Sequence, residues 1–507
     1  MLSRRDFIRT GAVAAGTLSF NPAFLRGAFA RQAQPGPSPY GPLGPADANG
    51  IRLPAGFRSR LIARHSEPVL PSAYVLPTLP DGAAIYPQDD GGWIMAVNSE
   101  APFRGQGGAS AIRFDKDGAV VDAYSILTGT QTNCSGGRTP WDTWLSCEEH
   151  EQGRVWECDI YGVKPAVELP AMGTRSHEAA CVDPIGKRVY LTEDEGDSGF
   201  YRFTPDSYPD LRTGLLEVAV VDPNGLVAWK RIYDPDATTV RNRKQIPEMT
   251  KFRRGEGLFF DYPFAYVTTS SDAKVHAYNV VTETIEVLWW GDGVKEDSPA
   301  VDIDQMTYST GGEIFVCEDE GELRIAVMSA DGRHMAPFLQ LVGEQHQRWP
   351  EFGNETTGVV FDPSGSRMYF SAQRTYGLGA IYEVTGPFRR ERVDVREPTL
   401  RVEAPVVARV GAVTGRGLPV SLLADEACTV TVLIRVPGRA GFRVARKRVR
   451  LEAGRRVRLR VRAGEKAARR LRRRRRGAAA ELVVRAVDER GQARSIVRAL
   501  RLRPRKR

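Results

Sequence analysis

Acidic residues and one cysteine recur beside short apolar segments in the first four hundred residues of the chain. Carboxylates held close together repel one another and raise each other's pKa, so a cluster of them needs cations. Since hard cations prefer oxygen ligands, the pattern predicts a Ca²⁺ site. Residues before an apolar segment are Cys134, His177 with Glu178, Glu256, Asp304 and Glu355; residues after one are Glu100, Glu148 with Glu149, Glu193 with Asp194, Asp272, Glu318 with Asp319, and Gln373 with Arg374.

These residues bound six copies of one hairpin-like unit, each with an apolar strand, a turn and a second apolar strand. The last residues of the units are 49, 45, 78, 47 and 55 positions apart, and the long interval holds an insertion around residues 205–250. A period of roughly 40–50 residues is typical of four-stranded propeller blades. The repeat therefore predicts an all-β, six-bladed β-propeller, with a β-sandwich as the rival fold. The units are residues 82–100, 133–149, 177–194, 255–272, 304–319 and 355–374.

Hairpin geometry brings the two sets of residues to one rim. The first strand of each unit should be innermost and the second should return beside it. The start of one and the end of the other then lie together near the axis. An acidic residue at a strand end is commonly just solvated, so the metal prediction rests on the recurrence. On position alone, the predicted metal ligands include Glu193, Asp194, Asp304 and Glu355.

The charge of the chain is divided between its two parts. Residues 401–507 hold 32 Lys and Arg against 8 Asp and Glu, a net of +24, and the other 400 residues hold 39 against 54, a net of −15. Strand-like segments and turns over residues 399–507 predict a small immunoglobulin-like sandwich, with residues 469–476 as an exposed arginine-rich loop. Such a module would dock to anionic wall polymer, lipid headgroups or extracellular nucleic acid. It could equally serve only solubility, and without an aromatic ladder base stacking is not expected.

The first thirty residues have the features of a twin-arginine export signal. Ser3-Arg4-Arg5 precedes a mild apolar stretch over residues 11–20, and Ala28-Phe29-Ala30 fits a cleavage site. We therefore expect a signal over 1–30, a propeller over 31–398, and a monomer in the periplasm, outside the cell or at the cell wall. No membrane-spanning segment is expected after signal removal. Disulfides are permitted there, but no Cys-x-x-Cys spacing indicates a zinc ribbon.

Several strings resemble the PhoX-type alkaline phosphatases, from about Tyr40 to Phe388. They are Asn133-Cys134-Ser135-Gly136-Gly137, Leu145-Ser146-Cys147-Glu148-Glu149, His177-Glu178-Ala179, Tyr190-Leu191-Thr192-Glu193-Asp194, Glu355-Thr356-Thr357-Gly358 and Ser371-Ala372-Gln373-Arg374. The resemblance implies a propeller with an axial cluster of Fe³⁺ and Ca²⁺ that hydrolyses phosphomonoesters. The last string departs from that of the longer members, and the chain is more compact than they are.

By this resemblance, Cys134 is the iron-binding thiolate, and Glu148, Glu149, Glu178 and Glu256 are carboxylate ligands. Cys147 could bind the iron instead, or could pair with Cys134 in a disulfide. Thiolate is soft enough for iron, which a calcium-only site would not need.

Phosphate-ester hydrolysis also needs groups that hold phosphate oxygens. Arg374 and Arg138 are predicted to bind them, although Arg374 could instead pair with a neighbouring carboxylate. His177 could be a ligand or a general acid, or could only orient Glu178. The expected function is thus an exported phosphomonoesterase acting on a small phosphoester. The alternatives are a calcium-binding propeller without catalysis, which binds a ligand or partner, and a lactonase-type hydrolase that would not need Cys134.

Overall fold

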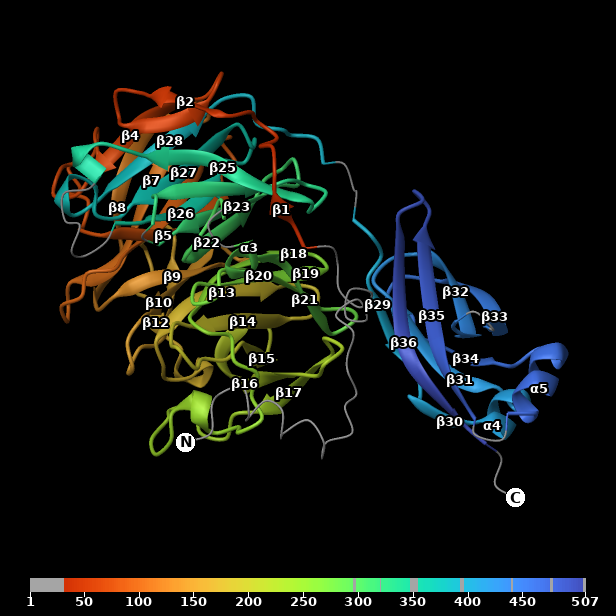
Figure 1. Ribbon diagram of the computed structural model, residues 1–507. Helices are drawn as coiled ribbons and strands as arrows, with labels where there is room; N and C mark the ends of the chain where they lie inside the picture. The colour runs from red at the N-terminus through yellow and green to blue at the C-terminus, as the bar shows by residue number, and fades with distance from the viewer. Residues whose placement is uncertain are drawn as a thin grey trace, which may run out of the picture. The chain divides into compact units, whose positions relative to one another are not determined.

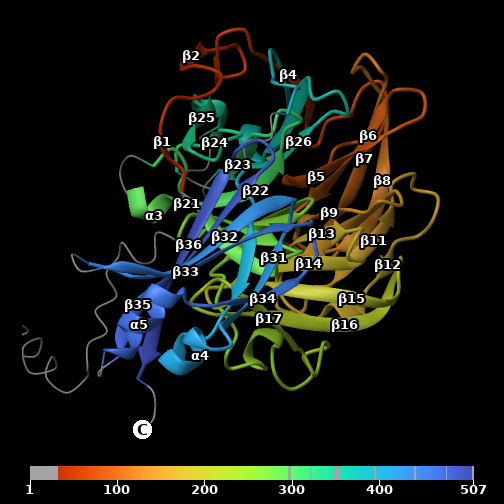
Figure 2. The same cartoon turned by 90° about the vertical axis from the view of Figure 1, so that its right-hand side faces the viewer.

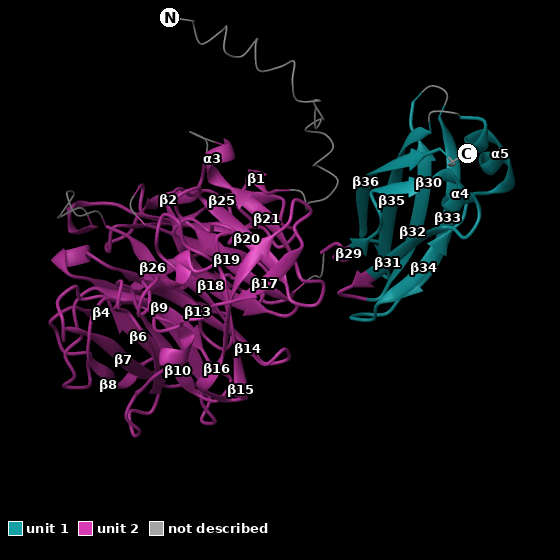
Figure 3. Cartoon of the chain, turned by 90° about the horizontal axis from the view of Figure 1, so that it is seen from below, with its two compact units in different colours: residues 1–30, 402–422, 427–507 teal, residues 31–401, 423–426 magenta. Residues whose placement is uncertain are grey.

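The structure is a computed structural model that describes residues 32–294, 298–319, 321–346, 354–392, 396–438, 441–474 and 477–504. The predicted export signal, residues 1–30, lies outside the described residues. The chain forms two compact units, coloured separately in Figure 3. The larger contains residues 31–401 and 423–426, and the smaller contains 402–422 and 427–507.

Six antiparallel sheets make up the larger unit. Three come from the first half of the chain, and Figure 2 shows β6, β7 and β8 side by side. Their strands are β5 (Pro80–Pro87), β6 (Trp93–Ser99), β7 (Gly107–Phe114) and β8 (Val120–Thr130); β9 (Asn133–Arg138), β10 (Thr143–Glu148), β11 (Val155–Asp159) and β12 (Val167–Glu168); and β13 (His177–Asp183), β14 (Arg188–Glu193), β15 (Tyr201–Ser207), β16 (Asp210–Val221) and β17 (Val227–Arg231).

The other three sheets follow in chain order, and segments near the N-terminus complete two of them. β4 (Arg58–Arg64) pairs with β28, while β3 (Ile51–Pro54), β2 (Leu43–Ala46) and β1 (Gln34–Pro35) extend the sheet of β25. Their own strands are β18 (Gly255–Asp261), β19 (Phe264–Thr269), β20 (Lys274–Asn279) and β21 (Thr284–Trp290); β22 (Ile303–Tyr308), β23 (Ile314–Glu318), β24 (Arg324–Met328) and β25 (His334–Leu341); and β26 (Thr356–Phe361), β27 (Arg367–Ala372) and β28 (Ala380–Thr385).

The first strand of each sheet contacts the first strands of its two neighbours. The contacts run in a closed order from β5 to β9, β13, β18, β22 and β26, and back to β5. A separate apolar cluster fills each gap between neighbouring sheets. The cluster that closes the ring joins Phe114 of β7 to Tyr369 of β27, whose ring centroids are 5.0 Å apart. The larger unit is therefore all-β and propeller-like (Figure 1).

Short helical turns decorate the loops of this unit. None of those in the described residues supplies a side chain to the cluster of carboxylates described below. They are η1 (Pro170–Met172), η2 (Asn242–Lys244), α3 (Gly291–Val294), η4 (Glu344–His346) and η6 (Thr375–Gly377).

The smaller unit is also mainly β. One sheet has the order β29 (Leu400–Glu403), β31 (Leu418–Ala424) and β34 (Val457–Val461). The other has the order β30 (Val407–Arg409), β36 (Ala493–Arg503), β35 (Ala478–Asp488), β32 (Cys428–Val436) and β33 (Phe442–Leu451). Two helices, α4 (Val410–Thr414) and α5 (Glu465–Arg472), accompany them.

Helix α5 corrects part of the predicted arginine-rich loop. Arg469, Arg470 and Arg472 belong to the last turn of this helix. The helix forms because Ala467, Ala468 and Leu471 recur at helical spacing and are buried together, while the arginines occupy the other face. The sequence analysis predicted strands and a loop in this region and did not predict this short amphipathic helix.

Candidate metal centre

Each of the six inner hairpins has a register shift near the start of its inner strand. In five of them the shift follows the first pair of residues, for example between Pro80 and Ala83 in β5 and between His177 and Ala180 in β13. In β26 it follows the second pair, Thr357 with Ser371. A β-bulge re-aims the side chain at which it occurs. Six equivalent positions at the starts of the inner strands are therefore turned out of the regular alternation.

Five of these six positions carry a possible metal ligand. The residues are buried, in a ring around the axis of the unit. Thr357, the sixth member, donates a hydrogen bond of 2.8 Å to Oδ1 of Asp81. In chain order the ring is Asp81, Cys134, Glu178, Glu256, Asp304 and Thr357; we call it the inner ring.

A second ring comes from the residue that follows each second strand. Its members contact the inner ring directly: Ser270 donates to Oε1 of Glu256 at 2.6 Å, and Gln373 donates to Oδ2 of Asp81 at 2.6 Å. Gln373 also donates to Oε2 of Glu100 at 2.5 Å. This outer ring consists of Glu100, Glu149, Asp194, Ser270, Asp319 and Gln373, and Glu355 lies between the two rings.

Three groups within the two rings have ligand atoms close enough to share an ion. In each group the candidate atoms all lie within 4.8 Å of one another. The groups are Cys134 with Glu149 and Glu178; Glu178 with Glu256 and Asp304; and Asp81 with Glu100 and Glu355. Because Glu178 belongs to two groups, it is the natural bridging position.

Burial and mutual repulsion make this cluster hold protons. Burial and the neighbouring Glu100 raise the pKa of Asp81 to about 8. Burial is also the main cause that raises the pKa of Glu149, Glu178, Glu256, Asp304 and Glu355 well above the usual range, and other carboxylates add to it. Ionised together, they need compensating positive charge.

Two guanidinium groups face the cluster. Arg254 donates to both oxygens of Asp194, at 2.9 and 3.0 Å, and lies 3.7 Å from Glu256. Arg374 is 3.7 Å from Oε1 of Glu355, and its side chain is 25% exposed. Burial acts against its charge, but the carboxylates of Glu355 and Glu100 outweigh burial and raise the pKa of Arg374. Two arginines do not neutralise nine carboxylates.

The donor set fits hard cations. Oε2 of Glu178 is buried without a hydrogen-bond partner among the described residues, as is Oε1 of Gln373. A buried acceptor left without a partner costs about 1–3 kcal/mol, and a cation at the shared position of Glu178 would satisfy it. The rings therefore offer oxygen ligands with one sulfur beside them.

Cys134 rather than Cys147 lies at the cluster. Its Sγ is 3.3 Å from Oε1 of Glu178, to which the thiol donates. Cys147 is fully buried in the apolar cluster between two sheets, among Leu145, Val155 and Leu191, and burial raises its pKa to about 12. All six cysteines are free, so the alternative Cys134–Cys147 disulfide is absent.

Two predicted ligands turn away from the axis. Glu148 accepts hydrogen bonds from the amides of Gln131 and Arg154, each at 3.2 Å, and from Nε1 of Trp156 at 3.0 Å. Although burial opposes it, contacts with His150 and Trp156 lower the pKa of Glu148. The carboxylate stabilises its own loop, and it belongs to none of the three ligand groups.

Glu193 is the other. It accepts a hydrogen bond of 2.7 Å from Arg243 and one of 2.5 Å from the hydroxyl of Tyr201. Arg243, from the insertion, also pairs with Glu195 and Asp197, at 3.1 and 3.0 Å. Both oxygens of Glu193 are therefore engaged away from the axis, and Glu193 belongs to none of the three ligand groups. The remaining predicted ligands converge at the axis: Cys134, Glu149, Glu178, Glu256, Asp304 and Glu355 belong to the three groups, and Asp194 lies beside them, held by Arg254.

His177 immediately precedes Glu178, but its side chain does not reach the rings. It is fully buried, and its Nε2 bonds the carbonyl of Gly173 at 3.1 Å, which assigns the proton to Nε2. Burial and the nearby Arg175 lower its pKa well below the usual range. Its position on the strand, one residue before the bulge, directs it away from the rings, so the structure does not bring it to the cluster.

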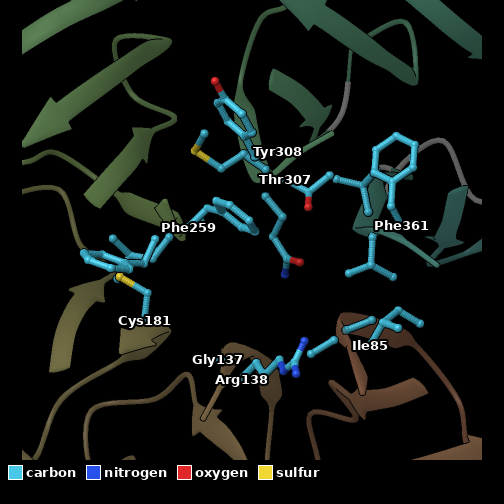
Figure 4. A pocket seen from close by; sticks show the side chains of 18 of the residues that line it. Ile85, Gly137, Arg138, Cys181, Phe259, Thr307, Tyr308 and Phe361 are labelled. Carbon is cyan, nitrogen blue, oxygen red and sulfur yellow. The ribbon is translucent and has the colours of Figure 1, made fainter. Parts of the chain in front are cut away.

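Arg138 lies at the opposite end of the axis from the rings. It is the last residue of β9, four residues after Cys134, or about 13 Å along a strand. It lines a cavity of about 500 Å³ together with Phe259 and Phe361, and Figure 4 shows these three side chains around it. The structure therefore does not bring Arg138 beside Arg374, although both were predicted to bind phosphate oxygens.

Two site residues escaped the sequence analysis. Asp81 immediately precedes the first repeat as it was delimited, and the shared pattern of a ligand followed by a small residue, as in Glu178-Ala179 and Glu256-Gly257, would have included Asp81-Gly82. Arg254 had no such signal, because it precedes its strand and has no counterpart in the other repeats. Glu100 had been noted only as a strand end.

Comparisons with known proteins support the resemblance. The family model of alkaline phosphatase PhoX matches residues 105–165 and 153–285, which hold Cys134, Glu149, Glu178 and Glu256. The predicted similarity to the PhoX family is therefore confirmed over this part of the chain. No curated protein matches the sequence.

Several solved structures match the chain at low similarity. A gluconolactonase, XC5397 from Xanthomonas campestris, is 14% identical with a TM-score of 0.41, over 69% of this chain and 99% of that one. The β-propeller domain of Cps50 (Swd1) from Myceliophteria thermophila is 8% identical with a TM-score of 0.37, over 62% and 99%. In the part of the chain that the structure describes, no helix is long and apolar enough to cross a membrane.

Proposed function

We propose that this chain is an exported, metal-dependent phosphomonoesterase of the PhoX type, built on a six-bladed β-propeller. The observation that carries the proposal is the convergence of nine carboxylates and the Cys134 thiol at the axis, where the described residues supply two arginines. The match of residues 105–285 to the PhoX family supports phosphatase chemistry at this centre. The predicted signal at residues 1–30 would direct it out of the cytoplasm by the twin-arginine route.

Two kinds of ion suit the ligands. Ca²⁺ would be held by Glu178, Glu256 and Asp304 and by Asp81, Glu100 and Glu355, which offer only oxygens. Iron would be held beside Cys134, with Glu149 and Glu178, since sulfur suits a softer ion. When bound, the ions would supply positive charge that neutralises the phosphate and the developing charge on the leaving oxygen.

The residues of the chain would position the substrate around that charge. Arg374, partly exposed and only 3.7 Å from Glu355, would rotate its guanidinium toward phosphate oxygens and hold them bidentately. Arg254, fixed by both oxygens of Asp194, would stay in place and order the carboxylates of the outer ring. Gln373 and Thr357 would keep Asp81 oriented, since all three are buried and hydrogen-bonded together.

The decisive experiment measures metals and turnover in the same preparation. Protein purified after native export should contain calcium and iron by elemental analysis and should hydrolyse p-nitrophenyl phosphate. EGTA should abolish turnover, and Ca²⁺ should restore it. Full activity in EGTA, or no turnover with any metal, would overturn the proposal. Calcium without iron or turnover would instead favour a non-catalytic binding propeller.

Variants locate the chemistry. Glu178→Gln should lose metal and activity together, whereas Glu168→Gln, an exposed position on β12, should keep both. Cys134→Ser should lose iron and keep most of the calcium. If Cys134→Ser retains iron at the wild-type ratio, the thiolate assignment is wrong while the carboxylate site stands.

A further inference from the structure

The five-stranded sheet of the smaller unit has one apolar and one strongly basic face. Alternate residues of β32 and β35 are buried, among them Val430, Val432 and Val484. Cross-strand partners share a face of a sheet, so the positions between them define the other face. Nine arginines lie on that face: Arg409 of β30, Arg501 and Arg503 of β36, Arg485 of β35, Arg435 of β32, and Arg443, Arg446, Arg448 and Arg450 of β33. We call it the arginine face.

Little negative charge accompanies these groups. The one carboxylate on the arginine face among the described residues is Glu481, which accepts a hydrogen bond of 2.7 Å from Arg435. Glu489, in the adjoining turn, pairs with Arg450, and both side chains are about 70% exposed. Exposed pairs of this kind are weak and screened by salt, so they leave the face strongly basic.

The strand registers show how the arginines are arranged across the sheet. Arg446, Arg448 and Arg450 follow one another at about 6.8 Å along the edge strand β33. Arg501 and Arg503 of β36 lie beside Val407 and Arg409 of the other edge strand, β30, which is about 19 Å across the sheet from β33, and they are displaced along the strands. From Arg450 to Arg409 the path is about 39 Å long, so the nine arginines supply one positive charge per ~4 Å along it. Each strand of B-DNA carries one negative charge per ~3.4 Å.

We propose that the arginine face binds double-stranded nucleic acid through its phosphates, without regard to sequence. Guanidinium groups, unlike ammonium groups, pair bidentately with phosphate oxygens, and every basic residue on the face is arginine. Single strands are normally held by bases stacked on aromatic rings, but the described residues of this face include no Phe, Tyr or Trp. Its other side chains are small or medium-sized, such as Thr431, Val483 and Ser495, which permits close approach to a backbone.

The test compares two variants of equal net charge in the full chain. Arg446→Gln/Arg448→Gln/Arg450→Gln removes three charges from the arginine face. Arg455→Gln/Arg458→Gln/Arg472→Gln removes three exposed charges of the same unit that lie elsewhere. All six positions are exposed, so folding should change little, and a circular dichroism spectrum checks it. Binding of a labelled DNA duplex of random sequence is followed by fluorescence anisotropy as a function of KCl concentration.

The wild-type protein should bind with a steep dependence on salt. The face variant should lower the slope of log K against log salt by about 3, and the control variant should leave it near the wild-type value. Equal losses in both variants would show that net charge, not this face, holds the duplex. Equal or tighter binding to vesicles with anionic lipids, or to single strands, would overturn the choice of duplex nucleic acid.

Discussion

Neighbouring acidic residues at the ends of the second strands have opposite surroundings. Glu149, Asp194 and Asp319 reach the axis, where carboxylates gather and positive charge is scarce. Glu148, Glu193 and Glu318 immediately precede them and turn back into their own sheets. There they accept hydrogen bonds from loop amides or, in Glu193, from Arg243 and Tyr201. One residue along a strand reverses the side chain, and so separates a candidate ligand from a structural brace.

This comparison shows that charge alone does not define the metal centre. The braces are also carboxylates, and they are more buried than Glu149, Asp194 and Asp319, but their hydrogen bonds are complete within the protein. The axial carboxylates have too few donors, and Oε2 of Glu178 has no partner among the described residues. What distinguishes a ligand here is unsatisfied bonding capacity at a converging position.

The adjacent pair Glu148 and Glu149 provides the most direct test of the difference between ligands and braces. Glu149→Gln should lower kcat/KM for p-nitrophenyl phosphate by on the order of 10³-fold, because it removes a charged ligand from the Cys134 group. Glu148→Gln should keep activity within a few-fold and lower the free energy of unfolding by about 2 kcal/mol, since it weakens bonds to a charged acceptor. Kinetics and elemental analysis of both variants distinguish the two roles. A large loss of activity in Glu148→Gln and a small loss in Glu149→Gln would show that Glu148 is the ligand and Glu149 the brace.

A substitution at Glu193 tests the structural role of a brace and leaves the axial carboxylates unchanged. Glu193→Gln should lower the free energy of unfolding by about 3 kcal/mol, because it leaves the buried Arg243 without its closest partner. The remaining contacts with Glu195 and Asp197 keep the loss at the low end of the usual range. Urea unfolding measures it, and Glu217→Gln, whose partner is Arg202 near the start of β15, serves as the matched ion-pair control. Loss of metal in Glu193→Gln would contradict its assignment as a brace.

The repeat allowed most of the inner ring to be predicted from sequence. Cys134, Glu178, Glu256 and Asp304 occupy equivalent places before apolar segments, and radial repetition must bring such places together. The choice within a doublet such as Glu148-Glu149 could not be predicted, because the bulge that sets the direction of the side chains depends on backbone register.

Residues from outside the repeat that pair with its carboxylates could not be predicted from sequence either. Arg243 comes from the insertion around residues 205–250, and no local pattern ties it to Glu193. The position of Arg138, in contrast, was available from sequence: four residues in an extended strand place it far from Cys134. Helix α5 was missed because its apolar spacing covers only two turns within an arginine-rich segment.

The raised pKa values of the axial carboxylates predict that the stability of the protein depends on pH. The pKa of Asp81 is raised to about 8 from 3.8. Such a group stabilises the fold fully below its unfolded pKa, and the stabilisation is lost as pH rises through the folded value. The free energy of unfolding of the chelated protein should therefore fall as the pH rises from about 4 to 8. Saturating Ca²⁺ should remove the slope; a chelated protein whose stability does not change would show that the cluster needs no cation.

The two arginines at opposite ends of the axis give the smallest and most specific contrast. Arg374→Lys should raise KM for p-nitrophenyl phosphate about tenfold, because a lysine cannot hold phosphate bidentately, and its stability and metal content should be unchanged. Arg138→Lys should leave KM at the wild-type value, since Arg138 lines the cavity at the other end and its guanidinium lies over Tyr86 at 5.1 Å. Steady-state kinetics at saturating Ca²⁺ separates them. An equal rise in KM for both variants would place substrate along the whole axis, and a rise for Arg138→Lys alone would move the phosphate site to the cavity end.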